Sequence, residues 1–169
     1  MPVTKLREFL DSNNVKYTTT FHSTAYTAQE IASRAHIAGR QMAKTVIVKL
    51  DGELAMAVLP ASHQVDTYAL KKLTQAEKVT LATEFEFKTR FPDCETGAMP
   101  PFGNLYGMRV FVEEDLAKDV DIAFNAGSHT ELMMLAYKDF ERLVNPIVAK
   151  FSTRRLVAKG AAAGEDRLW

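Results

Sequence analysis

Residues 96–106 combine chain-breaking residues with apolar side chains. Seven successive positions hold Gly97, Pro100, Pro101 and Gly103. Neither a helix nor a central strand tolerates that density, because proline lacks the N–H donor and glycine costs conformational entropy. A rigid loop of this kind can hold backbone N–H and C=O groups in fixed directions, as a small-molecule or ester site requires. The alternative is a tight structural turn between two elements.

Lys44 is a second residue placed where it could do chemistry. It lies near the start of residues 43–50, which we expect to form a strand. Asp51-Gly52 then predicts a tight hairpin turn, and residues 53–59 are expected to form the returning strand. Strand alternation puts Lys44 on the same face as three aliphatic residues of its strand. This lysine therefore either lies inside a pocket or extends from the strand edge to water.

The histidines give a third candidate. No two of them have the spacing of a metal-binding pair on a helix, so we expect neither a metal site nor a cofactor. His129 follows Gly127-Ser128 in a predicted turn between two strands, where its side chain can face a cleft. The alternative is an ordinary surface histidine. The four histidines are His22, His36, His63 and His129.

Other catalytic motifs are missing from the sequence. Cys94 is flanked by Asp93 and Glu95, whose negative charges raise the pKa of a thiol, so a nucleophilic role is not expected. There is no Gly-x-Ser-x-Gly elbow, which argues against an ordinary serine esterase. The two glycine-rich motifs that bind nucleotide phosphates, Gly-x-x-x-x-Gly-Lys-Ser/Thr and Gly-x-Gly-x-x-Gly, are also absent.

Predicted hairpins and helices are interspersed along the chain. This order of elements favours an α/β fold of the α+β type, with a mixed sheet and helices around it. Residues 1–151 form one predicted domain, and residues 152–169 a mobile C-terminal tail without a periodic core face. The predicted helices are 3–12, 27–35, 66–73, 83–90 and 138–144. The predicted strands are 16–21, 43–50, 53–59, 107–113, 121–124 and 130–136.

Composition narrows the class of partner. The chain has 169 residues, with 21 Lys+Arg against 21 Asp+Glu, so there is no general basic field for a long nucleic acid and we expect no DNA partner. A single cysteine excludes an internal disulfide and fits a cytoplasmic protein. No apolar run approaches the roughly 18 residues that span a bilayer, so we expect no membrane partner.

Three segments together resemble a known family. Lys44 in Ala-Lys-Thr-Val-Ile-Val-Lys, the loop from Gly97 to Gly103 and the turn from Phe124 to His129 occur in the same order as in the YbaK/prolyl-tRNA synthetase-associated domain family. The resemblance covers roughly residues 1–150. Members of that family are aminoacyl-tRNA deacylases, either free-standing editing factors or insertion domains of synthetases. The resemblance implies a strongly curved mixed sheet and hydrolysis of mischarged tRNA in trans.

The resemblance also implies roles for individual residues. Lys44, Gly97, Pro101 and His129 would be catalytic. The substrate-binding residues would be Ala98, Met99, Pro100, Phe102, Gly103, Gly127 and Ser128. Contacts to acceptor-stem phosphates would come from Arg34, Arg40, Lys71 and Lys72, with Arg154 as a further candidate. The partner would be the acceptor end of an aminoacyl-tRNA, with a synthetase or elongation factor as a second partner. The alternative function is a module that binds a tRNA end or an aminoacyl group without turnover.

Overall fold

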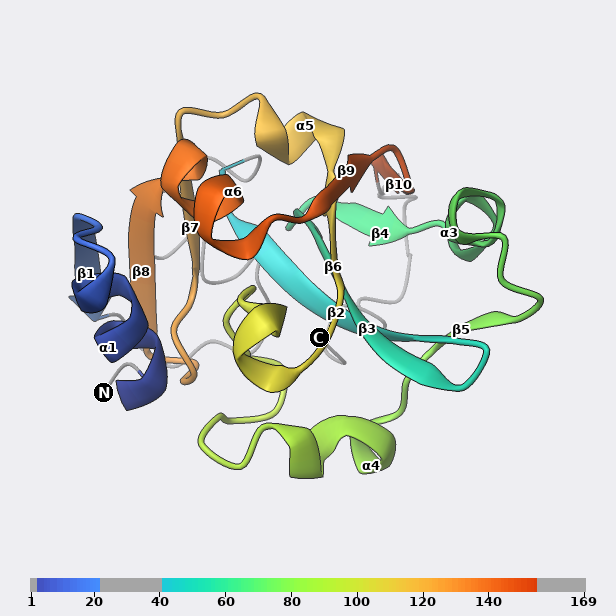
Figure 1. The fold of residues 1–169 in the computed structure, drawn as a ribbon, viewed down its shortest axis with the longest axis horizontal. Helices are drawn as coiled ribbons and strands as arrows, with labels where there is room; N and C mark the ends of the chain where they lie inside the picture. The colour runs from blue at the N-terminus through green and yellow to red at the C-terminus, as the bar shows by residue number, and fades with distance from the viewer. Residues whose placement is uncertain (1–2, 22–40, 155–169) are drawn as a thin grey trace, which may run out of the picture.

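The computed structural model describes residues 3–21 and 41–154 (Figure 1). Helix α1, Thr4–Ser12, turns Leu6 and Leu10 into the core, and Asn14 with φ 56° lets the chain leave the helix. Strand β1, Tyr17–Phe21, follows with a mostly exposed surface. Both elements match the predicted ranges within two residues. The predicted helix at 27–35 lies outside the described residues.

The main sheet contains five strands in the order β5-β2-β3-β6-β9. The β2–β3 and β2–β5 pairs are antiparallel, whereas β3–β6 and β6–β9 are parallel, so the predicted mixed sheet is confirmed. Asp51 and Gly52 both have positive φ, 51° and 87°, which is the requirement of the tight hairpin turn that their sequence predicts. The five strands are β2 Ala43–Leu50, β3 Glu53–Pro60, β5 Val79–Leu81, β6 Val110–Glu113 and β9 Ile147–Ala149.

A second, antiparallel sheet has the order β1-β8-β7, with β7 at Asp121–Asn125 and β8 at Glu131–Ala136. The two sheets meet where Met42 forms a parallel bridge with Ala123. The amide of Ala123 donates to the carbonyl of Gln41 at 3.0 Å. Strand β7 therefore runs beside the beginning of β2, and the turn after β7 is brought close to the start of that strand.

Short helices surround the sheets, and local capping explains where they begin. Asp66 caps α3, Thr67–Thr74, by accepting a hydrogen bond from the amide of Ala69 at 3.1 Å. Thr83 and Glu86 form the predicted capping box of α4, Glu84–Phe87, which continues as a 3-10 turn at Lys88–Arg90. The last two helices are α5 Glu114–Ala117 and α6 Tyr137–Val144.

Phe102 lies at the centre of the aromatic core. Its fully buried ring is 6.3 Å from that of Phe9, 5.6 Å from Phe124 and 5.4 Å from Phe140, measured between centroids. The loop that contains Phe102 is thus held between α1, β7 and α6. Strands β2 and β3 are buried on both faces over most of their length, as expected for the middle of a covered sheet.

The folded part extends beyond the boundary that we expected at residue 151. Ser152–Arg154 forms strand β10, which pairs antiparallel with β4, His63–Val65. The remainder of the predicted tail lies outside the described residues. The longest helix within the described ranges has nine residues, so none of the helices there is long enough to cross a bilayer.

Candidate functional site

The glycine–proline loop and the turn after β7 are joined by hydrogen bonds. The amide of Gly127 donates to the carbonyl of Ala98 at 2.9 Å, and the amide of Glu95 donates to the carbonyl of Gly127 at 2.8 Å. The carboxylate of Glu95 in turn accepts from the amide of His129 at 3.0 Å. Two segments separated by about thirty positions in the chain therefore form one structural unit.

The imidazole of His129 adds a side-chain connection to this unit. Its Nε2 lies 2.8 Å from the carbonyl oxygen of Thr96. A carbonyl can only accept a hydrogen bond, so Nε2 carries the proton and donates it. The side chain is 7% exposed. His129 thus connects the turn to the loop.

Gly127 is required by the close approach of the N-terminal segment. Its φ is +101°, and a Cβ at this position would lie 2.3 Å from Cγ2 of Val3. The amide of Val3 donates to the carbonyl of Ala126 at 3.0 Å, which fixes the beginning of α1 against the turn. Only glycine fits this position without displacing the chain.

The loop itself is packed into the domain. Residues 98–103 are all buried, and Gly97 has φ +85°. A Cβ at Gly103 would lie 2.6 Å from Cγ2 of Val110, so this glycine allows the loop to press against β6. The loop is therefore an apolar segment that packs closely against the rest of the domain.

Lys44 is buried, with 8% of its surface exposed, at the second position of β2. Continuing the parallel register of the Met42–Ala123 bridge by two residues sets Lys44 beside Asn125. Asn125 is the last residue of β7, and its buried Oδ1 has no hydrogen-bond partner among the described residues. The burial does not fit a lysine that extends from the strand edge to water, and it agrees with a lysine inside the protein.

Cys94 lies close to the loop, but its surroundings oppose thiolate formation. The pKa of Cys94 is raised to about 12, mainly by burial; the hydroxyl of Tyr106, 3.5 Å away, opposes this rise, and the charge of Asp93 adds to it. The predicted direction of the pKa shift is correct, but burial, not charge, is its main cause. At neutral pH the thiol is protonated.

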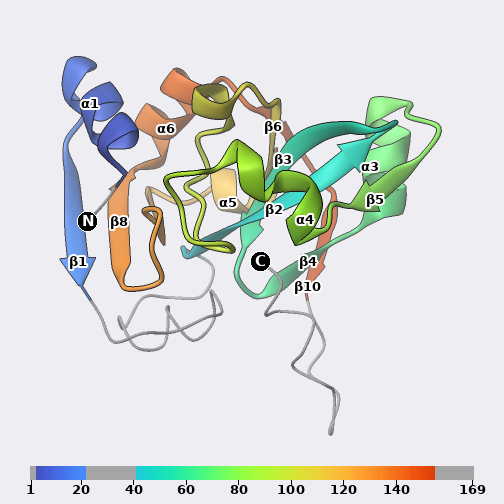
Figure 2. The ribbon, with the colours of Figure 1, turned by 90° about the horizontal axis from the view of Figure 1, so that it is seen from below.

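Of the predicted tRNA contacts, Lys71 and Lys72 are exposed on α3, and Nζ of Lys72 lies 4.8 Å from the centroid of the Tyr68 ring. Both views place α3 at the opposite end of the long axis from β8 (Figures 1 and 2). Arg34 and Arg40 lie outside the described residues.

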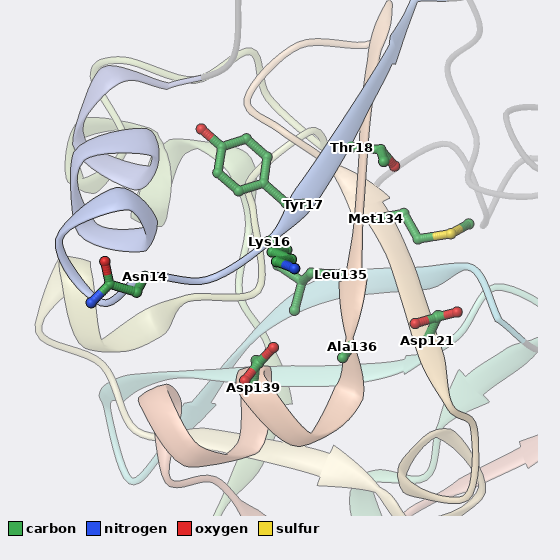
Figure 3. A pocket seen from close by; sticks show the side chains of 9 residues that line it. All are labelled: Asn14, Lys16, Tyr17, Thr18, Asp121, Met134, Leu135, Ala136 and Asp139. Atoms are coloured by element: carbon green, nitrogen blue, oxygen red, sulfur yellow. The ribbon is translucent and has the colours of Figure 1, made fainter.

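A pocket of about 540 Å³ opens where β1, β8 and α6 meet (Figure 3). None of the residues predicted for the site lines it. The side chains around it carry both charges, from Lys16, Asp121 and Asp139. The remaining lining residues are Asn14, Tyr17, Thr18, Met134, Leu135 and Ala136.

One cluster could hold a metal ion. Donor atoms of His63, Glu113 and Asp115 all lie within 4.8 Å of one another. No local motif predicts this cluster, because the histidine is about fifty positions away from the acidic residues. Glu95, which joins the loop to the turn through its amide and its carboxylate, also has no signal in the sequence, since no local pattern distinguishes it from an ordinary polar residue.

Comparisons with known proteins agree with this architecture. The chain resembles a crystal structure of a hypothetical protein with a TM-score of 0.80 and 18% identity, covering 88% of this chain and 99% of the other. A second structure, described as "a putative trans-editing enzyme for prolyl tRNA synthetase", gives a TM-score of 0.76 and 18% identity, covering 89% and 96%. At this identity the likeness establishes the fold.

Sequence comparison identifies the family. A proline–tRNA ligase of Bacillus mycoides (strain KBAB4) is 25% identical over 93 residues, which is 55% of this chain but only 16% of the ligase. The family model for the aminoacyl-tRNA editing domain matches residues 22–143, which contain Lys44, the glycine–proline loop and the turn at His129. The chain therefore belongs to the aminoacyl-tRNA editing domain family.

Proposed function

We propose that the protein is an aminoacyl-tRNA deacylase, which hydrolyses the ester between a wrong amino acid and the terminal ribose of a tRNA. The observation that carries this proposal is the arrangement of three segments of an editing domain. Lys44 is buried at the start of β2, β7 runs beside it, and the turn after β7 is hydrogen-bonded to the loop at residues 95–98.

The chemistry follows from a buried cation and fixed backbone dipoles. An aminoacyl ester is already activated, so a strong nucleophile is not mandatory. The ammonium of Lys44 would stabilise the negative charge that develops on the ester oxygen, in surroundings where little water screens it. The backbone at Gly97–Pro101 would hold the carbonyl and a small amino-acid side chain, and the attack would come from water or from a group of the substrate.

The protonation of Cys94 supports a mechanism without a cysteine nucleophile. With a pKa near 12, its thiol has almost no thiolate at neutral pH. His129 supports the same view, because its Nε2 proton is already donated to the Thr96 carbonyl. Among the described residues, the Lys44 ammonium and the loop backbone are the groups that we propose to act on the ester.

We further propose that the protein acts in trans, as an editing factor for translation fidelity in the cytoplasm. The structural relative described as a trans-editing enzyme is matched over 96% of its length, which supports this mode of action. Its description and the proline–tRNA ligase relative make tRNA charged by prolyl-tRNA synthetase the first substrate to test. A synthetase or elongation factor would be the second partner, delivering or receiving the tRNA.

The test is deacylation of a panel of mischarged tRNAs that carry small amino acids. Lys44→Met keeps most of the side-chain volume and removes the charge; we expect it to lower kcat by about 10²–10³, the usual effect of losing one oriented electrostatic group. Lys49→Met is the matched control. Lys49 is on the same strand but is half-exposed and pairs with Glu86 on the surface, so this variant should keep wild-type activity.

The outcomes separate the candidate functions. Full activity of Lys44→Met would remove this lysine from the mechanism. A wild-type protein that binds aminoacyl-tRNA but leaves every ester intact would be the binding module that the sequence leaves open. Equal losses in both lysine variants would show that the effect comes from general positive charge.

A further inference from the structure

His63, Glu113 and Asp115 converge from three elements outside the proposed deacylase residues. His63 begins β4, Glu113 ends β6 and Asp115 lies in the first turn of α5. Figure 1 shows β4 and α5 near the same end of β6. One donor atom from each side chain lies within 4.8 Å of the other two.

Glu113 points to a missing ligand. Its side chain is 1% exposed. Oε2 accepts a hydrogen bond from the amide of Phe151 at 2.8 Å, but the equally buried Oε1 has no partner among the described residues. A buried carboxylate oxygen without a partner is unfavourable, and a cation would satisfy it.

The surroundings of His63 also suit metal binding. Its Nδ1 lies 2.8 Å from Oγ of Ser152, which is 4% exposed. When Nδ1–H donates to this hydroxyl, the lone pair of Nε2 is available for an ion, which is the usual arrangement of metal-bound histidines.

Strand β10 and the residue before it hold both His63 and Glu113 in place. Phe151, the residue before it, donates to Glu113, and Ser152, its first residue, contacts His63. The pairing of β10 with β4 sets Ser152 opposite Val65 and Arg154 opposite His63. Loss of a partner that orients a metal ligand in this way typically lowers metal affinity by about 10–100-fold.

The pocket beside the cluster and the charges of its carboxylates also suit a metal ion. His63 and Asp115 line a pocket of about 480 Å³, so an ion and its water can enter. The two carboxylates match the charge of a divalent ion. Nζ of Lys118 lies 3.3 Å from Oδ1 of Asp115 and would compete with an ion, but this lysine is 71% exposed and can turn away.

We infer that His63, Glu113 and Asp115 bind one divalent transition-metal ion, with Zn²⁺ as the best fit to the donors. One imidazole and two carboxylates suit Zn²⁺, and three protein ligands leave a position for water from the pocket. The ion would tie β4 to the β6–α5 junction once the exposed Asp115 side chain rotates toward it.

The site departs from our expectation of no metal, and the reason is the spacing of its ligands. The expectation rested on the distances between histidines in the sequence. Only one histidine takes part here, and its partners come from a different strand and helix, so no local motif exists.

Isothermal titration of chelator-treated protein with Zn²⁺ tests the inference. We expect one Zn²⁺ per chain at this site and a higher Tm in its presence, because the ion binds only the folded chain. Asp115→Asn should weaken binding at least tenfold and abolish the Tm increase. Ser152→Ala should weaken it about 10–100-fold through the orientation of His63.

Two surface variants keep the test decisive. Lys118→Ala should tighten Zn²⁺ binding, since it removes the competing ammonium, whereas Asp121→Asn, in a different pocket, should change nothing. The inference is overturned if the wild-type protein does not bind Zn²⁺. It is equally overturned if Asp115→Asn and Lys118→Ala both bind Zn²⁺ like the wild type, which would place the ion elsewhere.

Discussion

Replacing Gly127 by alanine tests whether the turn after β7 is held by the close approach of the N-terminal segment. The backbone φ of +101° is unfavourable for any residue with a Cβ, at a cost of about 1–2 kcal/mol. The added Cβ would also lie 2.3 Å from Cγ2 of Val3, and such overpacking typically costs about 1–3 kcal/mol. We expect a total loss near 3 kcal/mol in the free energy of unfolding.

For a domain of this size, that loss corresponds to a decrease in Tm of roughly 6–12 °C. Urea unfolding followed by circular dichroism gives the free energy, and calorimetry gives Tm. Gly52→Ala is the matched control, because Gly52 has a similar φ of +87° but no heavy atom within 4 Å of the added Cβ. It should lose only the conformational part, about 1–2 kcal/mol.

A double-mutant cycle with Val3→Ala isolates the contact itself. In the wild type, Val3→Ala removes buried methyl groups and destabilises the protein. In the Gly127→Ala background it also relieves the clash, so its cost should fall or reverse. Equal losses for the two glycine variants, together with strict additivity of Val3→Ala, would refute the packing explanation.

Three further perturbations follow from the structure. The Cys94 thiol has its pKa raised from 9.0 to about 12, so at neutral pH it should react with iodoacetamide roughly 10³-fold more slowly than a free thiol until urea unfolds the chain. The stability that this pKa shift contributes to the folded state is present below pH 9 and is lost as the pH rises toward 12. Cys94→Ala should therefore flatten this part of the curve of unfolding free energy against pH. Thr83→Ala should lose about 1 kcal/mol in urea unfolding as the capping box is broken, and Thr83→Ser should restore it. Phe102→Ala should cost about 3–5 kcal/mol by the same measurement, and a smaller loss would mean that the loop collapses into the cavity.

The parts of the fold that the sequence predicts well are those with a local physical cause. Asp51-Gly52 determines its own turn through backbone conformation, and Asp66 and Thr83 begin helices with their own side chains. The strand at residues 43–50 is recognisable because the β-branched run Thr-Val-Ile-Val lies shortly before a hairpin turn. In each case the cause and its effect lie within a few residues of each other.

What the sequence could not predict depends on distant partners. Strands β4, β9 and β10 have three residues each, too few for a periodic pattern, and they exist because a neighbouring strand supplies the hydrogen bonds. The same holds at the site. Glu95 contributes because its carboxylate reaches His129 across the fold. The ordered set of Lys44, the loop and the turn indicated the family, while the contacts that join them appear only in three dimensions.

The hydrogen bond from the Val3 amide to the Ala126 carbonyl has a practical consequence for work with this protein. An affinity tag joined to the chain close to Val3 would lie next to the segment on which the proposed chemistry depends. A cleavable tag, compared before and after its removal, would show whether an apparently inactive preparation owes its inactivity to the fusion.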